Sequence, residues 1–147
     1  MDFESLIKLP AAPTDPAHAV TKQYVDDLAK AAIAFVIDGG GSAIATGVKG
    51  DLMIPFDCTI VSATLLADQS GSIVIDIWKD TYANFPPTSG DSITASAKPT
   101  LSSATKSQDV TLTGWTTSIS AGQTLRFNVD SASTVTKVTL ILKVQKG

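Results

Sequence analysis

Hydrophobic and polar residues alternate with a period of two over much of the chain beyond residue 35. In the clearest runs one alternate set is apolar throughout: Val61, Ala63 and Leu65; Ile73, Ile75 and Ile77; Leu125, Phe127 and Val129; Val138, Leu140, Leu142 and Val144. A strand places successive side chains on opposite faces, so each run predicts a strand with one face in a core. Shorter candidate strands lie near 35–37, 51–56, 92–95 and 109–112.

Clusters of Asp, Gly, Ser and Pro separate these runs and mark turns. They lie at 38–41, 68–71, 85–88, 113–114 and 121–122. About eight strands with no helix between them predict a closed or two-sheet antiparallel architecture. A mainly β domain over residues 35–147, an antiparallel jelly-roll-like β-sandwich, is therefore the predicted fold.

A helical period precedes the strands. Apolar residues from Ala17 to Phe35 are spaced by three or four, which predicts one short amphipathic helix over 16–34, with Asp15 as its cap and Pro16 in its first turn. A lone helix of this length is marginal in water, so it needs a partner. Its narrow, nearly heptad stripe suits a self-associating bundle. The predicted interface comprises Val20, Tyr24, Leu28 and Ala31.

The first 15 residues predict an extended peptide without a fold of its own. Pro10 and Pro13, with Pro16 just beyond, restrict the backbone away from helix. Four apolar side chains make this peptide too hydrophobic for a solvated linker, and they favour an anchor that becomes ordered on a partner: Phe3, Leu6, Ile7 and Leu9.

Composition excludes several classes of function. Of 147 residues, 44% are hydrophobic and 17% charged, which excludes global disorder. The longest mainly apolar stretch, 28–37, is far short of the ~20 residues of a membrane span, and we expect neither membrane insertion nor a signal peptide. The net charge is −3 and the basic residues are scattered, so we expect no nucleic-acid partner.

Few residues suggest catalysis. The chain has one cysteine, Cys58, which alternates into a strand and is expected to be a buried, inert thiol; its one histidine, His18, precedes the β region. The sole glutamate is Glu4, and the aspartates are dispersed without a calcium-loop pattern. We therefore expect no catalytic residue, no cofactor and no metal. A small polysaccharide depolymerase remains an alternative, because a carboxylate pair needs only spatial proximity.

The aromatic residues offer a more specific hypothesis. Trp78 points away from the face of Ile73, Ile75 and Ile77, so it packs under a loop, joins a subunit interface or contacts a ligand such as a sugar ring. Tyr82 follows in a proline-terminated loop, and Trp115 follows a Thr-Gly turn. The candidate glycan site comprises these aromatic residues and nearby polar groups: Trp78, Tyr82, Trp115, Asp76, Asp80 and Asn84.

Residues 9–26, LPAAPTDPAHAVTKQYVD, resemble the segment of tailed-bacteriophage fibre proteins in which a proline-rich stretch leads into HAVNKQYVD, with Thr21 where Asn is common. Residues 70–79, SGSIVIDIWK, and the stretch from TGWT at 113–116 to RFNV at 126–129 are similar to a domain at the C-termini of phage fibre and appendage proteins. The resemblance implies a homotrimeric virion component.

On this resemblance the chain is a non-enzymatic structural protein, a short fibre or a head or tail appendage, because 147 residues leave no room for a long shaft. We expect it to be assembled in the host cytoplasm and exposed on the particle surface. The expected partners are its own copies through residues 16–34, other virion proteins through residues 1–15, and host surface polysaccharide through the β domain. A free carbohydrate-binding module is the alternative.

Overall fold

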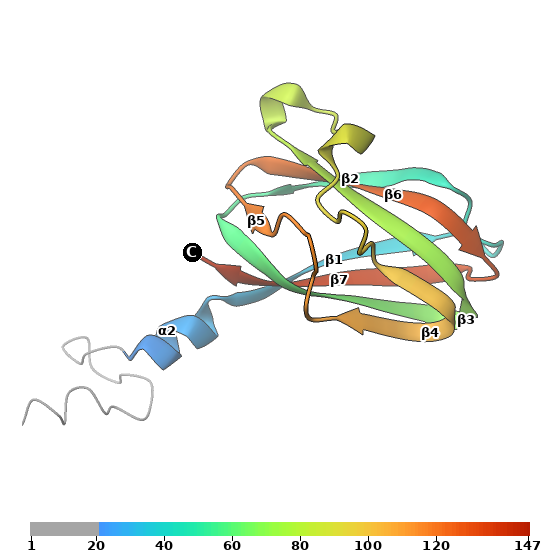
Figure 1. Ribbon diagram of the computed structural model, residues 1–147, viewed down its shortest axis with the longest axis horizontal. Coiled ribbons are helices and arrows are strands. Elements are labelled where there is room, and N and C mark those ends of the chain that lie inside the picture. Colours follow the sequence, from blue (N-terminus) through green and yellow to red (C-terminus); the bar gives the residue numbers. More distant parts are fainter. Residues whose placement is uncertain (1–20) are drawn as a thin grey trace, which may run out of the picture. The chain divides into compact units, whose positions relative to one another are not determined.

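The computed structural model describes residues 21–147 (Figure 1). The chain divides into two compact units, Met1–Lys30 and Ala31–Gly147. The predicted anchor residues Phe3, Leu6, Ile7 and Leu9 lie outside the described residues, as do His18 and Val20. None of the helices in the described part is long and apolar enough to cross a membrane.

The second unit is mainly β, as the alternation predicts, and is built from one curled antiparallel sheet. Its strands within residues 21–147 are β1 (Lys30–Asp38), β2 (Gly47–Ile54), β3 (Cys58–Asp80), β4 (Thr100–Asp109), β5 (Ser118–Ile119), β6 (Gln123–Ser133) and β7 (Lys137–Lys146). Their order in the sheet is β1-β7-β3-β6-β2, and β4 and β5 also pair with β3.

The 23-residue strand β3 organises this sheet because its two halves pair with different strands. Residues 58–67 pair with β7, and residues 72–80 pair with β6. The predicted turn at 68–71 is wrong: the strand bends there without ending, and its register with β4 shifts on either side of Gly71. A β-carbon at Gly71 would lie 2.6 Å from the carbonyl oxygen of Ser133, so this close approach requires glycine.

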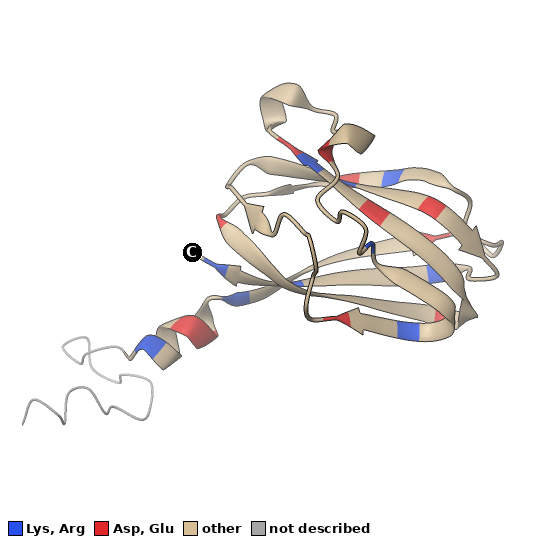
Figure 2. Cartoon of the chain, viewed as in Figure 1, with Lys and Arg blue, Asp and Glu red and all other residues tan. Residues whose placement is uncertain are grey.

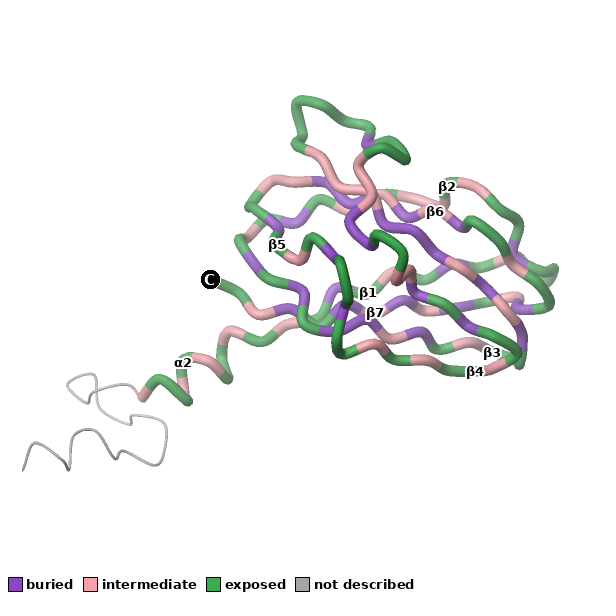
Figure 3. The backbone as a smooth tube through the Cα atoms, viewed as in Figure 1, coloured by how far each residue is buried: buried purple, intermediate pink, exposed green. Residues whose placement is uncertain are grey.

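The inward faces of the strands form one core, visible as alternating buried positions in Figure 3. The predicted apolar faces of β6, β7 and the second half of β3 are all buried. Val61 is the exception at 40% exposed, because a bulge between Ile60 and Ser62 shifts the alternation and buries Ile60 instead. Phe35 and Phe127 stack with ring centroids 4.3 Å apart.

The predicted helix over 16–34 is wrong from residue 30 onward. Within the described part of that range, helix α2 spans Lys22–Leu28, and strand β1 begins at Lys30. Ala31 and Phe35 share a face at a spacing of four in a helix and also in a strand, which is why the stripe misled the prediction. Ala31 therefore belongs to β1, and the predicted domain boundary at residue 35 falls inside that strand.

Strand β4 was missed, and the candidate strands at 92–95 and 109–112 are wrong; of 109–112 only Asp109 lies in a strand, as the last residue of β4. β4 reads TLSSATKSQD, with too few apolar residues to give an alternating signal. Residues 92–95 contain one isolated bridge, between Ser92 and Trp78, and no continuous strand.

Helix α2 is short, and its side chains stabilise it locally. The Thr21 hydroxyl accepts a hydrogen bond from the Tyr24 amide at 3.1 Å, which caps the first turn. Lys22 pairs with Asp26 four residues on. None of residues 22–28 is buried, and Val25 and Leu28 are 51% and 62% exposed.

Candidate functional site

The predicted site residues gather around the connection between β3 and β4, residues 81–99. This connection contains two short 3-10 turns, η1 (Tyr82–Asn84) and η2 (Ser89–Asp91), and then the stretch Ser92–Pro99, which makes a turn where the Ala97 amide donates to the Thr94 carbonyl (Figure 1). The Ser92–Pro99 stretch is bonded to β3 at both ends. The Ile93 amide donates to the Ile77 carbonyl at 2.9 Å, and the Ile75 amide donates to the Pro99 carbonyl at 3.0 Å.

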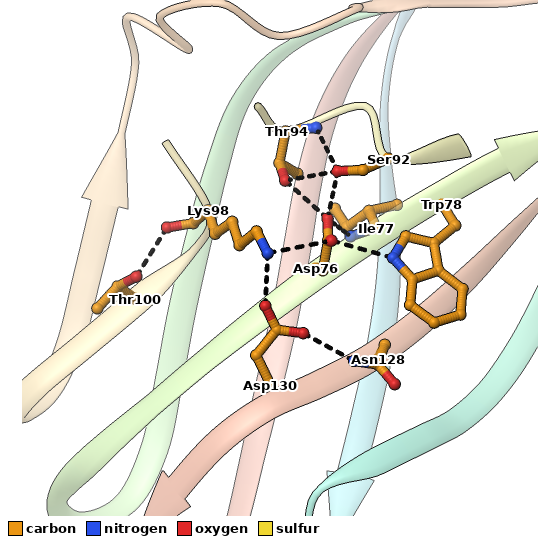
Figure 4. Close-up of polar contacts among 9 residues, drawn as sticks. All are labelled: Asp76, Ile77, Trp78, Ser92, Thr94, Lys98, Thr100, Asn128 and Asp130. Atoms are coloured by element: carbon orange, nitrogen blue, oxygen red, sulfur yellow. Dashed lines mark hydrogen bonds and ion pairs between the residues drawn. The ribbon is translucent and has the colours of Figure 1, made fainter. Parts of the chain in front are cut away.

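The Asp76 side chain binds the polar side chains of the Ser92–Pro99 stretch (Figure 4). The residue lies on β3 and is only 4% exposed. Its Oδ1 accepts hydrogen bonds from the Ile77 amide, the Ser92 hydroxyl and the Thr94 hydroxyl, at 2.7 to 2.8 Å. Its Oδ2 accepts from the Trp78 indole at 3.0 Å and lies 3.3 Å from the Lys98 ammonium. Both carboxylate oxygens are thus occupied by donors of the same chain.

These partners keep Asp76 charged. Burial alone raises the pKa of an aspartate, but hydrogen bonds from Ser92, Thr94, Trp78 and Lys98 outweigh burial here and hold the pKa of Asp76 below its usual value. Lys98 also pairs with Asp130 at 2.6 Å, and the pKa of Lys98 is raised by that hydrogen bond and by Asp76. The group is an ion network of two carboxylates and one shared ammonium that joins the connection to β3 and β6.

Both tryptophans are held by this connection. Trp115 is 9% exposed, and its indole donates to the Ala97 carbonyl at 2.8 Å. Trp78 is half-buried, its backbone bridges to Ser92, and its indole is bonded to Asp76. Of the three readings of Trp78, these contacts favour packing against a loop. Asp76 and Trp115 do not offer exposed surface to a ligand.

The η1 turn is rigid at its base and exposed at its tip. The Asp80 carboxylate accepts hydrogen bonds from the Thr81 amide at 2.7 Å and the Asn84 side-chain amide at 3.2 Å. The Thr81 hydroxyl caps the turn by accepting from the Asn84 amide at 3.3 Å. Tyr82, between these groups, is 75% exposed, and its hydroxyl has no hydrogen-bond partner in residues 21–147.

Two hollows adjoin Tyr82. The first, called here the Met53 hollow, has a volume of about 290 Å³ and is lined by Asp51, Leu52, Met53, Tyr82, Phe85 and Thr124. The second, called here the Gly122 hollow, has a volume of about 560 Å³ and is lined by residues 81–83 and 120–123. Tyr82 belongs to both linings, so one exposed aromatic side chain borders two recesses.

An ion pair at the edge of the Met53 hollow balances its charge. Arg126 binds the Asp51 carboxylate through two hydrogen bonds, of 2.7 and 3.0 Å, and the two residues are cross-strand partners on β6 and β2. Hydrogen bonding to Asp51 raises the pKa of Arg126. The Phe85 ring lies over the guanidinium, with 5.2 Å from Cζ to the ring centroid. Acidic and basic positions lie interspersed on the strands in this part of the sheet in Figure 2.

The structure thus divides the six predicted glycan residues. Tyr82 remains at the surface; Asp80 and Asn84 hold its turn in place; Asp76, Trp78 and Trp115 hold the rest of the connection. Sequence reasoning missed Asp51 and Met53, which line a hollow with Tyr82, and Arg126, which lies against the Phe85 ring. The β2 residues lie about thirty positions away in the chain, and no local pattern links them to Tyr82.

The remaining side chains that could react or bind a metal are buried or far apart. Cys58 is buried as predicted, and burial raises the pKa of its thiol, which keeps it protonated. In residues 21–147, no group of three or more His, Cys, Asp or Glu side chains is placed to hold a metal ion.

Comparisons with protein-family models, with curated proteins and with solved structures found no match to this chain.

Proposed function

We propose that the chain is a non-enzymatic structural protein of a bacteriophage particle, a short homotrimeric fibre or decoration appendage. In this proposal, residues 1–15 attach it to other virion proteins, and α2 associates with its copies in two further chains. The β unit is the exposed head, a jelly-roll-like sandwich that contacts host surface glycans. The phage assignment is supported by the likeness of residues 9–26 to fibre sequences.

One structural observation carries the assembly part of the proposal. Helix α2 has seven residues, none of them buried, while isolated helices shorter than about 12 residues are marginal in water. Its exposed apolar side chains, Val25 and Leu28, lie next to the half-buried Tyr24. Association with the same helix of other copies would cover these side chains and stabilise the helix.

Light scattering of the purified full chain tests this assembly. At micromolar concentration we expect a mass three times the 15.2 kDa of one chain. Leu28→Lys places a charge in the proposed interface and should reduce the mass to that of one chain. Gln23→Lys adds the same charge on the same helix, at an exposed position where the ammonium can still donate to Asp27, and should leave the trimer intact. A single 15.2 kDa species for the unmodified chain would contradict the proposal.

Deletion of residues 1–15 tests the attachment. The truncated chain should keep the melting temperature of the β unit but fail to enter virus particles. Particles that carry it at the normal copy number would show that attachment uses another surface.

A free carbohydrate-binding module is the second candidate, and the exposure of Tyr82 favours it. The two candidates differ in the N-terminal region, because a free module has no use for an anchor or for an assembling helix. A monomeric full chain that binds saccharide would favour this second candidate.

A further inference from the structure

We propose that the Met53 hollow binds one ring of a neutral saccharide, and that Tyr82 is its principal contact. The inference deepens the proposed attachment function and rests on it for the source of the ligand. The site itself lies within one chain, so it is tested separately from assembly. It differs from the site that the sequence suggests, because neither tryptophan belongs to its lining.

The size of the hollow selects a small ligand. Small-molecule sites measure about 300–1,000 Å³. At about 290 Å³ the Met53 hollow lies at the lower limit of that range and suits a single ring. The larger Gly122 hollow shares Tyr82 and contains no charged residue in its lining. A second ring of the same saccharide could therefore bind beside the first.

The lining matches the two kinds of surface on a pyranose. Such a ring has apolar C–H faces and a rim of hydroxyl groups. Tyr82, Phe85 and Met53 are 75%, 45% and 58% exposed, and together they offer aromatic and thioether surface to the C–H faces. The Asp51 oxygens each keep lone-pair capacity beyond their bonds to Arg126, so they can accept hydrogen bonds from hydroxyls at the edge.

Charge in the hollow favours a neutral ligand. Asp51 is the only lining residue that carries a charge, and Arg126 pairs with it through two hydrogen bonds. An anionic sugar would meet the carboxylate, and a cationic one would compete with Arg126. A neutral hexose avoids both penalties while it keeps the stacking and the hydroxyl contacts.

The turn that carries Tyr82 is organised before any ligand binds. Asp80, Thr81 and Asn84 close the turn through three hydrogen bonds, so little loop ordering remains to oppose binding. Because the hollow is shallow and open, a single site should bind with a dissociation constant on the order of millimolar. Three heads on one trimer would raise the avidity by roughly 10²-fold or more if their spacing matches the target.

The two methionines provide a direct readout. Met53 lines the hollow and Met1 lies in the N-terminal region, so a chain labelled with methyl-¹³C methionine gives one reporter signal and one internal reference. The probes are methyl glucoside, methyl galactoside, methyl mannoside and N-acetylglucosamine, with the anionic N-acetylneuraminic acid as a charged comparison. We expect at least one neutral sugar to shift the Met53 signal in a saturable way and to leave Met1 unchanged.

Matched variants assign the shift to the hollow. Tyr82→Ala should abolish it, and Tyr82→Phe should retain most of it because the ring face remains. Leu66→Ala removes an exposed apolar side chain from a separate hollow of about 350 Å³ and should leave the shift unchanged. A melting curve for each variant shows that the fold is retained.

Each outcome supports or overturns the proposal. No shift with any neutral sugar, or a shift that survives Tyr82→Ala, overturns it. A shift caused by apolar peptides but not by sugars makes the hollow a peptide site and also overturns it. A saturable sugar shift in a chain that proves monomeric supports the hollow while removing the trimeric part of the proposed function.

Discussion

Two stretches of the same connection, Ser92–Pro99 and Thr81–Phe85, differ in whether their side chains are bonded within the molecule or exposed to solvent. In the first, the groups that meet Asp76 are bonded within the molecule, and Ile93 and Pro99 are buried. In the second, hydrogen bonds form only the base of the turn, while Tyr82 and Phe85 remain exposed. The hydrogen-bonded groups around Asp76 therefore form a structural frame of the β unit, and the exposed aromatic side chains beside it form the proposed recognition surface.

The comparison also shows that a charged side chain in this connection can have a structural role. In sequence, Asp76 stands two residues before Trp78, which makes it a candidate ligand contact. In the structure it is the most extensively hydrogen-bonded carboxylate of the region. Its position under Ser92 and Thr94 makes it a structural group (Figure 4). Buried charges in proteins are retained when they are paired and hydrogen-bonded, and this one has five donors.

Removal of the Asp76 carboxylate should have the largest effect. Asp76→Ala removes one partner of Lys98 and the carboxylate acceptor of Ser92, Thr94 and Trp78, so we expect a loss of about 3 kcal/mol in the free energy of unfolding. For a chain of this size that corresponds to roughly 10 °C in melting temperature. Asp91→Ala is the control: it removes the carboxylate that closes the η2 turn and should lower the stability by no more than about 1 kcal/mol.

Replacement of Trp115 should have a smaller effect of the same kind. Trp115→Phe keeps an aromatic ring but removes the indole donor to the Ala97 carbonyl, so we expect a loss of about 1–2 kcal/mol. Tyr82→Phe, its counterpart at the exposed turn, should leave the melting temperature unchanged. Equal losses at both positions would abolish the distinction between the two stretches.

Acid should remove the stability that the charged Asp76 contributes. The pKa of Asp76 is lower in the folded chain than in the unfolded chain, so the unfolded chain binds more protons as the pH falls. The stability from Asp76 is present at neutral pH and is lost as the pH falls through the ordinary aspartate range, near 4, toward the lower folded value. The stability difference between the wild-type chain and Asp76→Asn, from urea unfolding, should therefore narrow below about pH 4. A constant difference would assign the effect to packing.

Loosening the base of the η1 turn should have the smallest effect on stability. Asp80→Ala removes acceptors for Thr81 and Asn84 at a surface turn, and we expect a loss of about 0.5 kcal/mol. Amide hydrogen exchange at Asn84 and Phe85 should accelerate, while exchange at Ile93 stays slow. Faster exchange at Ile93 as well would mean that the two stretches open together.

Local pattern predicts the parts of this fold whose strands alternate cleanly. Ile73, Ile75 and Ile77 are buried with Trp78 on the opposite face, as expected from period two. Strand β4 has polar residues at most positions, and the bend at Gly71 resembles a turn in sequence. Both depend on pairing with distant residues, which no short window of sequence contains.

In the candidate site too, some features can be predicted from local sequence and others depend on distant residues. The sequence identifies Tyr82 because it lies in a short loop that ends in prolines. It does not reveal that Lys98 and Thr94 meet Asp76, or that Met53 lies beside Tyr82, because both contacts depend on how the connection folds back over the sheet.

The most direct test of the division between the Asp76 frame and the proposed recognition surface measures two properties in two variants. For Trp78→Ala and Tyr82→Ala, the melting temperature and the sugar-induced shift of the Met53 methyl signal are recorded together. We predict that Trp78→Ala lowers the melting temperature by several degrees and retains the shift, whereas Tyr82→Ala keeps the melting temperature and loses the shift. The reverse pattern, with binding lost at Trp78 and stability lost at Tyr82, would contradict the account.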